Sequence, residues 1–451
     1  MDPTIESLEK YGLVQDEDSL RVREFTKTKI LRLHRELYSA VFDQQMKEFS
    51  QGDAPQDIDP FSFVASKSLR GASDCGSYFC QVQKLDVLGR YAALYATRIL
   101  LPLPLQAPEK LSDEAQAAYQ VSHASLALLR LRPLLDAGLV FPVVMRAPAE
   151  CVHVLARQER MIEVMQDVAY DAAKEFQGDF RIRFQLPEKA PTGIPSVYIE
   201  GPEDFLEHGG LVMLIDEPKE FRLKSWRYDR HGMVELHGAR KLSFLAGIFS
   251  GIADETTFYL AYGRNRNARY LASRSGETFL LDLVTSQDEE LAASNAALNA
   301  YMTHSLPLLD DMPLASLVRI RRQERDSFAQ YRLAIGRLLA EVAKKKKRIG
   351  KQEVRELFRE QIEPELLKMK SELHQERRRQ FKRIVGGPGA MAASVGLGMF
   401  GQIIPAGATG VVGTSLLTEA AKSTCNHGTT LQEKNDFYFL LRLTQEVESS
   451  R

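Results

Sequence analysis

The chain contains 451 residues, of which 44% are hydrophobic and 26% are charged, and its formal net charge is −1. These values are ordinary for globular proteins, and a chain of this length forms about two to four structural units that bury their cores without disulfides. The four cysteines exclude a dense disulfide framework and favour a reducing compartment. Because the acidic, polar first residues exclude a secretion signal, we expect the protein in the cytoplasm.

Helix-forming segments dominate residues 1–178, which we predict to be a helical N-terminal domain. Residues 19–49 are rich in good helix formers and contain neither Pro nor Gly, a composition that predicts one long helix. Further helices are expected at residues 81–99, 112–136 and 148–176. Pro102 and Pro104 require an extended path between two of these helices, and the apolar run 141–145 predicts a strand.

The hydrophobic period changes at Gly178, and we predict a sheet-containing α+β domain at residues 179–285. The runs FRIRFQL, SVYIEG and LVMLID are short, alternate or carry β-branched residues, and are bounded by Pro and Gly, as strands are. A hairpin is expected around the four-residue turn DRHG, and one helix near residues 240–252. Two more apolar runs lie within residues 270–283.

Residues 286–384 are predicted to form a long antiparallel helical hairpin. Asp311 is suited to cap a helix whose first turn contains Pro313, and apolar residues then recur at helical spacing as far as Val342. The sequence KKKKRIG ends this helix, because Lys and Arg stabilise a helix C-terminus and Gly350 suits the position that follows it. The hairpin therefore has a basic tip.

The last residues, 385–451, are predicted to form a glycine-rich hairpin and a terminal amphipathic helix at residues 436–447, which closes over the hairpin or lies at an interface. The fold class predicted for the whole chain is α+β and predominantly helical. It consists of a helical N-terminal part, a small mixed sheet in the middle, a long antiparallel helical hairpin and a glycine-rich helical tail.

Basic residues are concentrated in the predicted helical hairpin. Residues 319–383 contain 21 Lys and Arg against 10 Asp and Glu, so this segment carries +11 and the remaining chain −12. Such an asymmetry indicates one contact surface for a polyanion, which is an anionic membrane surface, an acidic partner or a nucleic acid. Nucleic acid is the less favoured partner, because only Phe381 is interleaved with the charges for base stacking. The predicted basic surface comprises Lys344, Lys345, Lys346, Lys347, Arg348, Arg377, Arg378, Arg379, Lys382 and Arg383.

An uncharged run of 35 residues, Ile384–Thr418, contains nine glycines and the sequence GLGMFG, a literal G-x-G-x-x-G. A dinucleotide loop needs a strand before its first glycine and a helix after its last, and neither context is present. Nucleotide binding is therefore disfavoured, and no cofactor is predicted. The run is also short for two membrane spans, and its Gly, Ser and Pro content makes insertion of one span marginal.

Small residues recur every four positions in this run, as at Ala390, Ser394 and Gly398. This spacing lets two helix backbones approach closely inside the protein, in a homo-oligomer interface or at a membrane. Because each glycine in a soluble helix costs up to about 1 kcal/mol relative to Ala, so many glycines indicate a specific role in close packing. The predicted membrane or assembly contacts are Gly389, Ser394, Gly396, Gly398, Phe400, Gly401, Pro405, Gly410 and Gly413.

Two other motifs have simpler interpretations. Cys75 and Cys80 form a C-x4-C that could share a metal ion with Cys151 and His153, but this spacing is loose and a helix would direct Cys151 and His153 to different faces. Buried thiols are therefore the preferred interpretation, and no metal site is predicted. The sequence RHG at residues 230–232 matches the start of a phosphatase motif but lies in a predicted hairpin turn.

No nucleophile, metalloprotease or phosphate-loop motif is present in the sequence, so we predict no catalytic residue. We predict a non-enzymatic interaction or effector protein, with a layout like that of bacterial stress or phage-defence effectors. Its glycine-rich hairpin would contact the inner face of the membrane or mediate assembly. One alternative is a nucleic-acid-associated protein that binds phosphates through the basic hairpin. Another is an enzyme with a site in the central domain around Asp216, Arg230 and Asp282.

Overall fold

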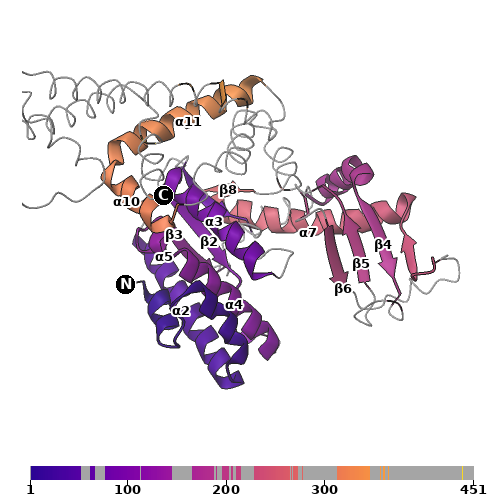
Figure 1. The fold of residues 1–451 in the computed structure, drawn as a ribbon, viewed down its shortest axis with the longest axis horizontal. Coiled ribbons are helices and arrows are strands. Elements are labelled where there is room, and N and C mark those ends of the chain that lie inside the picture. Colours follow the sequence, from indigo (N-terminus) through magenta and orange to yellow (C-terminus); the bar gives the residue numbers. More distant parts are fainter. Residues whose placement is uncertain are drawn as a thin grey trace, which may run out of the picture. The chain divides into compact units, whose positions relative to one another are not determined.

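The architecture is that of a computed structural model of the chain (Figure 1). The structure describes residues 2–51, 61–66, 77–111, 113–144, most of 165–272, 312–345 and a few single positions that include Glu277 and Phe439. The chain forms two compact units. One unit comprises Met1–Leu306, Pro313–Val318 and Leu339–Ile349, and the other comprises Pro307–Met312, Arg319–Leu338 and Gly350–Arg451.

One sheet of the first unit is parallel and has the strand order β3-β2-β1-β8. Its strands are β1 (Ser62–Ala65), β2 (Arg98–Leu103), β3 (Val140–Val144) and β8 (Arg269–Leu271). The register aligns Phe63 of β1 with Ile99 of β2 on one side and with Arg269 of β8 on the other. Nearly every residue of β1, β2 and β3 is buried, which is typical of a parallel sheet that is covered on both faces.

Helices cover both faces of the parallel sheet. The crossover helices are α3 (Tyr78–Leu94), α4 (Glu114–Arg130), α5 (Arg132–Leu135) and α7 (Gly238–Arg264). Successive residues of a strand point to opposite faces. On one face the ring of Phe63 contacts that of Tyr91 in α3, with the centroids 5.4 Å apart. On the other face Val64 belongs to a core cluster with Tyr259 and Tyr262 of α7. The parallel sheet is therefore doubly wound.

Helix α2 (Lys27–Gln51) is fixed to this domain by buried polar contacts. Gln45 is 4% exposed, its Nε2 donates to the hydroxyl of Tyr262 at 2.9 Å, and its Oε1 accepts from the N–H of Val144 at 3.0 Å. The imidazole of His34 is fully buried, with its Nε2 2.9 Å from Oε1 of Gln120 in α4. Burial lowers the pKa of His34, so the ring is held neutral.

The turn from α7 into β8 depends on Gly263. A Cβ at this position would lie 2.6 Å from the carbonyl oxygen of Ala268 and 3.3 Å from Cγ2 of Val64. The N–H of Ala268 donates to the carbonyl of Gly263 at 2.9 Å, which closes the turn. Because no side chain fits here, the end of α7 lies close against β1 and directs β8 alongside it.

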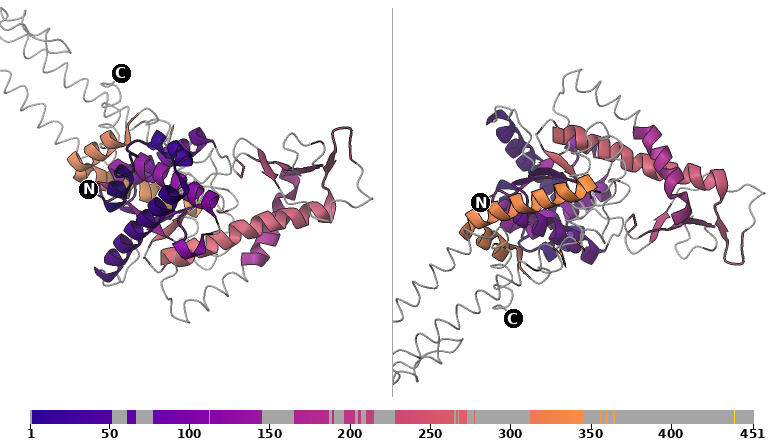
Figure 2. Two further views of the ribbon diagram at one scale, coloured as in Figure 1. Left: turned by 90° about the horizontal axis from the view of Figure 1, so that it is seen from below. Right: turned by 90° about the horizontal axis from the view of Figure 1, so that it is seen from above.

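The second sheet is antiparallel and has the strand order β6-β5-β4-β7. Its strands are β4 (Arg181–Gln185), β5 (Ser196–Glu200), β6 (Gly210–Leu214) and β7 (Met233–Glu235). Alternate residues such as Ile182 and Phe184 enter a core with Phe249 of α7, whereas Arg183 forms an ion pair with Glu200 across the opposite face. The single continuous helix α7, clear in Figure 2, thus contributes to the cores of both sheets.

The second unit is described mainly through α11. Helix α10 (Leu314–Gln323) precedes α11 (Arg325–Lys345), and Figure 1 shows the bend between them. Phe439 is fully buried and packs its ring against those of Phe328 and Tyr331 in α11, with centroids 5.2 and 5.5 Å away. Phe439, a residue of the predicted terminal helix, therefore packs on α11, which is the first arm of the helical hairpin predicted at residues 286–384.

Several predicted elements are confirmed, and others need correction. The runs FRIRFQL, SVYIEG and LVMLID contain β4, β5 and β6, and the strand at 141–145 is β3. The helix predicted at 81–99 ends at Leu94, because the apolar residues from Arg98 belong to β2. The apolar residues predicted within 270–283 begin in β8 (Arg269–Leu271), which pairs with β1 and not with the central strands, so two sheets replace the single mixed sheet.

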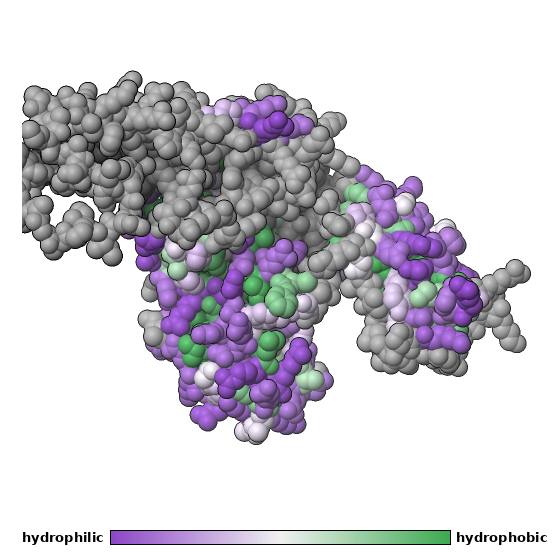
Figure 3. All heavy atoms as spheres, viewed as in Figure 1, coloured by the Kyte–Doolittle hydropathy of each residue, from purple (hydrophilic) through white to green (hydrophobic). Residues whose placement is uncertain are grey.

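The surface of the described parts carries hydrophobic residues mostly as single side chains among hydrophilic ones on the face that Figure 3 shows. Exposed large hydrophobic residues include Phe79, Tyr119 and Tyr170. Among the described residues, no helix combines the length and the apolar character that crossing a membrane requires.

Candidate functional site

The strand order creates a topological switch point between β1 and β8. From β1 the chain moves outward to β2 and β3, and it later returns to the other side of β1 to form β8. Ser66 directly follows β1 and is fully buried, and its N–H donates to the carbonyl of Leu271 at the end of β8, at 3.1 Å. In doubly wound sheets, ligands bind beyond the carboxyl ends of the strands at such a point. This edge is the first candidate site.

Helix α7 brings polar side chains to the same edge. Helix α7 ends at Arg264, and the chain reverses direction before β8 begins at Arg269, so α7 and β8 run antiparallel. Residues before the end of α7 therefore lie beside the later residues of β8. Eight residues back along a helix span about 12 Å, and a three-residue strand spans about 10 Å. Thr256 therefore lies near the level at which β8 ends.

Tyr270 of β8 is the centre of a polar cluster, which we define as Glu255, Thr256, Tyr259, Tyr270 and Glu277; all but the half-buried Glu255 are buried. The ring of Tyr270 is stacked on that of Tyr259 with centroids 5.9 Å apart, and its hydroxyl lies near that of Thr256 without a hydrogen bond of ordinary geometry. Burial, followed by the negative charges of Glu277 and Glu255, holds the pKa of Tyr270 well above 10. Glu277 is itself only 4% exposed.

The polar cluster has a definite chemical character. Tyr270 keeps its proton and can donate a hydrogen bond, whereas the carboxylates of Glu255 and Glu277 accept them. Such a site suits a ligand with hydroxyl or ammonium donors. Across the described ranges, no group of three or more His, Cys, Asp or Glu is placed to hold a metal ion.

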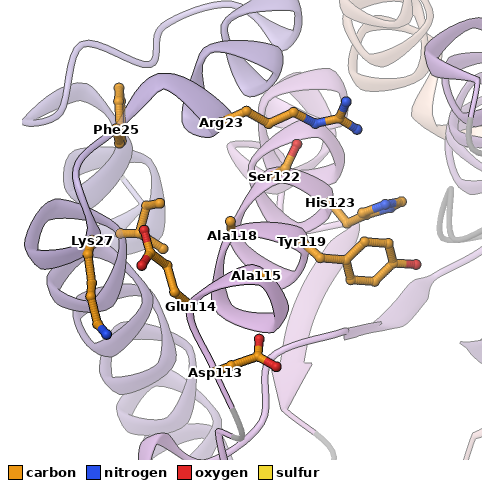
Figure 4. Close-up of a pocket in the computed structure, with 11 residues that line it drawn as sticks. Arg23, Phe25, Lys27, Asp113, Glu114, Ala115, Ala118, Tyr119, Ser122 and His123 are labelled. Carbon is orange, nitrogen blue, oxygen red and sulfur yellow. The ribbon is translucent and has the colours of Figure 1, made fainter.

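A groove of about 590 Å³ lies elsewhere in the first unit, between the start of α2 and the first half of α4. Figure 4 shows Arg23 at one end, with Ser122 and His123, and Asp113 at the other. Ala115, Ala118 and Ser122 follow one face of α4 at helical spacing, and their small side chains leave the groove hollow. We call this the α2–α4 groove.

The walls of the α2–α4 groove carry aromatic rings and charges. Tyr119 is 52% exposed and packs its ring on that of His123, with centroids 4.1 Å apart. Arg23, Lys27 and Glu114 line the groove and make no ion pair with any other residue that the structure describes. Asp113, in contrast, caps α4 by accepting from the N–H of Gln116 at 2.7 Å.

Most site residues predicted from the sequence fall outside the described residues. Lys344 and Lys345 lie at the end of the described part of α11. The remaining predicted basic residues and the whole predicted membrane or assembly contact set, from Gly389 to Gly413, are not among the described positions. These expectations therefore remain predictions.

The weaker motifs are placed more clearly. Cys80 lies in α3 with a partly exposed side chain, whereas Cys75, Cys151 and His153 are outside the described residues. The RHG sequence lies in a turn that Asp229 stabilises by accepting from the N–H groups of His231 and Met233, at 2.8 and 2.9 Å.

The glycine of the RHG sequence is explained by the backbone of this turn, because Gly232 has a φ of 70°, a conformation that favours glycine. Asp216 and Asp282, the other members of the proposed enzyme site, are not among the described positions.

Sequence reasoning did not identify the polar cluster or the α2–α4 groove. One usable signal is the triplet Glu255-Thr256-Thr257, which interrupts an otherwise apolar half of α7. Glu277 gives no such signal, because its burial follows from tertiary packing alone. The groove combines segments 90 residues apart, Arg23 and Asp113, which no local pattern connects.

Comparison with known proteins provides no relative from which a role could be transferred. The sequence matches no protein-family model, and no curated protein or solved structure is significantly similar to it.

Proposed function

We propose that the protein acts by contact with another surface, and that residues 346–438 are its contact segment. This segment contains most of the predicted basic surface and the whole glycine-rich run. The observation that supports the proposal is the burial of Phe439 against Phe328 and Tyr331 of α11. In the sequence this segment lies between α11 and Phe439, and Phe439 is held against α11, so the C-terminal boundary of the contact segment is fixed to that helix.

Both compositional features of the contact segment suit such a role. Its cationic residues attract an anionic surface, and each Lys or Arg near an anionic membrane contributes about 1 kcal/mol. The small residues at intervals of four let helices pack closely, within an oligomer or at the lipid boundary. The two features are adjacent in the sequence, since Arg383 directly precedes the glycine-rich run.

The test compares the full chain with a variant in which residues 384–418 are replaced by a short Gly-Ser linker. We expect the full chain to sediment with phosphatidylcholine–phosphatidylserine vesicles, or to form an oligomer by light scattering, and the variant to lose that property. Vesicles of phosphatidylcholine alone show how much of the lipid binding depends on the negative charge of the membrane. The double variant Arg377→Glu with Arg378→Glu tests how much depends on the positive charge of the protein. If the variant retains both the lipid binding and the mass of the full chain, the proposal is wrong.

A second candidate function is binding of a small ligand at the switch point between β1 and β8. The specific observation in its favour is that the strand order and the polar cluster around Tyr270 mark the same edge of the sheet. A ligand bound there would be the trigger that the contact segment reports. Its hydrogen-bond donors would meet the carboxylates of Glu255 and Glu277.

Thermal unfolding with adenosine, glucose and spermidine as probes tests this second function, because each probe carries hydroxyl or ammonium donors and none carries a phosphate that the two carboxylates would repel. A ligand that binds only the folded state raises the unfolding temperature. We expect at least one probe to stabilise the full chain, and Glu277→Gln to remove most of that shift. If none of the three probes moves the transition, the proposed ligand chemistry of this edge is wrong.

A further inference from the structure

We propose that the α2–α4 groove binds an extended acidic peptide segment of a partner protein. This inference is independent of the contact segment and of the switch point, because it rests on a different surface. The groove is open, unlike the enclosed sites that bury most of a small ligand. Its length along α4 follows from the nine helical steps from Asp113 to Ser122, which at about 1.5 Å each span about 13 Å. That length accommodates about four residues of extended chain.

The charges of the groove specify which peptide fits. Arg23 and Lys27 are exposed cations that form no ion pair with a described residue, so carboxylates of a bound segment would be their counterions. Ser122 lies beside Arg23 in Figure 4, but its Oγ donates to the carbonyl of Ser19 at 2.9 Å. Arg23, with His123 next to it, is therefore the residue at this end of the groove that would bind a carboxylate of the peptide. At the opposite end Glu114 would accept from a backbone N–H or a basic side chain of the peptide.

The aromatic residues supply the apolar part of the contact. Tyr and Arg are among the residue types that contribute most of the binding energy at protein interfaces. Tyr119 exposes half of its surface at the groove, and Figure 4 shows Phe25 on the other side. Between them, Ala115 and Ala118 leave space for an apolar side chain of the peptide. The preferred segment thus carries an apolar residue flanked by an acidic one.

The experiment presents a degenerate peptide pool to the immobilised full-length protein, and the retained peptides are sequenced by mass spectrometry. The wild-type protein should enrich Asp and Glu next to an apolar position. Arg23→Glu with Lys27→Glu should reduce retention of acidic peptides by about fivefold, since two exposed ion pairs are lost. Both side chains are exposed, so this variant should fold, and circular dichroism confirms it.

Two further variants keep the test decisive. Arg35→Glu removes an exposed cation of α2 outside the groove, and it should retain acidic peptides as the wild type does. Ala115→Trp fills the groove from an exposed position and should abolish retention. The inference is overturned if the pool shows no acidic enrichment, if the Arg23 and Lys27 double variant retains the same peptides, or if Arg35→Glu weakens retention equally. Full displacement of the peptides by AMP would also overturn it, because the groove would then be a small-anion site.

Discussion

Replacement of Gln45 by Leu tests whether α2, α7 and β3 are joined as the fold requires. The side chain is 4% exposed and makes two hydrogen bonds, to Tyr262 of α7 and to the N–H of Val144 at the end of β3. Leu fills a similar volume but can form neither bond. The substitution therefore removes the polar link and leaves the apolar packing nearly intact.

The magnitude follows from the groups that Gln45→Leu leaves behind. The buried N–H of Val144 loses its acceptor, which costs about 1–3 kcal/mol. The hydroxyl of Tyr262 loses a donor, and the loss of one ordinary hydrogen bond costs about 1 kcal/mol. We expect Gln45→Leu to lower the free energy of unfolding by about 3 kcal/mol. Tyr262→Phe removes only the second bond but leaves the buried Nε2 of Gln45 without that acceptor, so it should lower this free energy by a smaller amount, about 1–2 kcal/mol.

Urea unfolding followed by far-ultraviolet circular dichroism measures these differences, with the slope of the transition checked for each variant. Gln44→Leu is the matched control, because the Gln44 amide makes one long bond, 3.3 Å to Asp2, at a half-buried site. Its effect should stay below about 1 kcal/mol. If Gln45→Leu is no more destabilising than Gln44→Leu, the polar link does not hold these elements together.

Three further predictions concern other contacts. Arg130→Lys should lower stability by about 1–2 kcal/mol in the same urea assay, because Lys cannot reproduce the two bonds of 2.7 Å that the guanidinium makes to Asp86. Burial lowers the pKa of His34, so below about pH 6.5 the unfolded chain binds a proton at this imidazole that the folded chain does not bind. The free energy of unfolding should therefore fall as the pH drops below about 6.5. Urea titrations at several pH values should show a weaker dependence for His34→Gln. Phe439→Ala should lower the stability of α11 by about 3–5 kcal/mol, because it removes a fully buried ring. Amide hydrogen exchange should become faster in α11 and stay unchanged in β2. If α11 of the variant exchanges as slowly as α11 of the wild type, the contact does not stabilise this helix.

The sequence predicts those helices and strands whose hydrophobic pattern can be recognised from a short stretch of consecutive residues. Strands β4 and β5 alternate between core and surface residues, so their pattern identifies them directly. The helix predicted at residues 112–136 begins nearly where α4 (Glu114–Arg130) begins, after the capping Asp113, and its last residues form the separate short helix α5. Local chemistry therefore determines these elements.

The parallel sheet was not predictable, for two physical reasons. Strand β1 has only four residues, and all are buried, so it shows no alternation. Strand β8 is separated from β3 by more than 100 residues that contain another sheet, and its pairing with β1 depends on the close turn at Gly263. The polar cluster depends on that pairing, because Tyr270 reaches Glu255 only when β8 lies against α7.

Hydrogen–deuterium exchange of the glycine-rich run, residues 384–418, in the full-length protein is the most direct test of the contact proposal. The exchange is measured in dilute protein, at a concentration that favours any oligomer, and with phosphatidylserine-containing vesicles. Close packing of the small residues predicts slow exchange in at least one of these states and faster exchange after Ser394→Lys with Gly398→Lys. Exchange at the rate of an unstructured peptide in all three states would contradict the proposal.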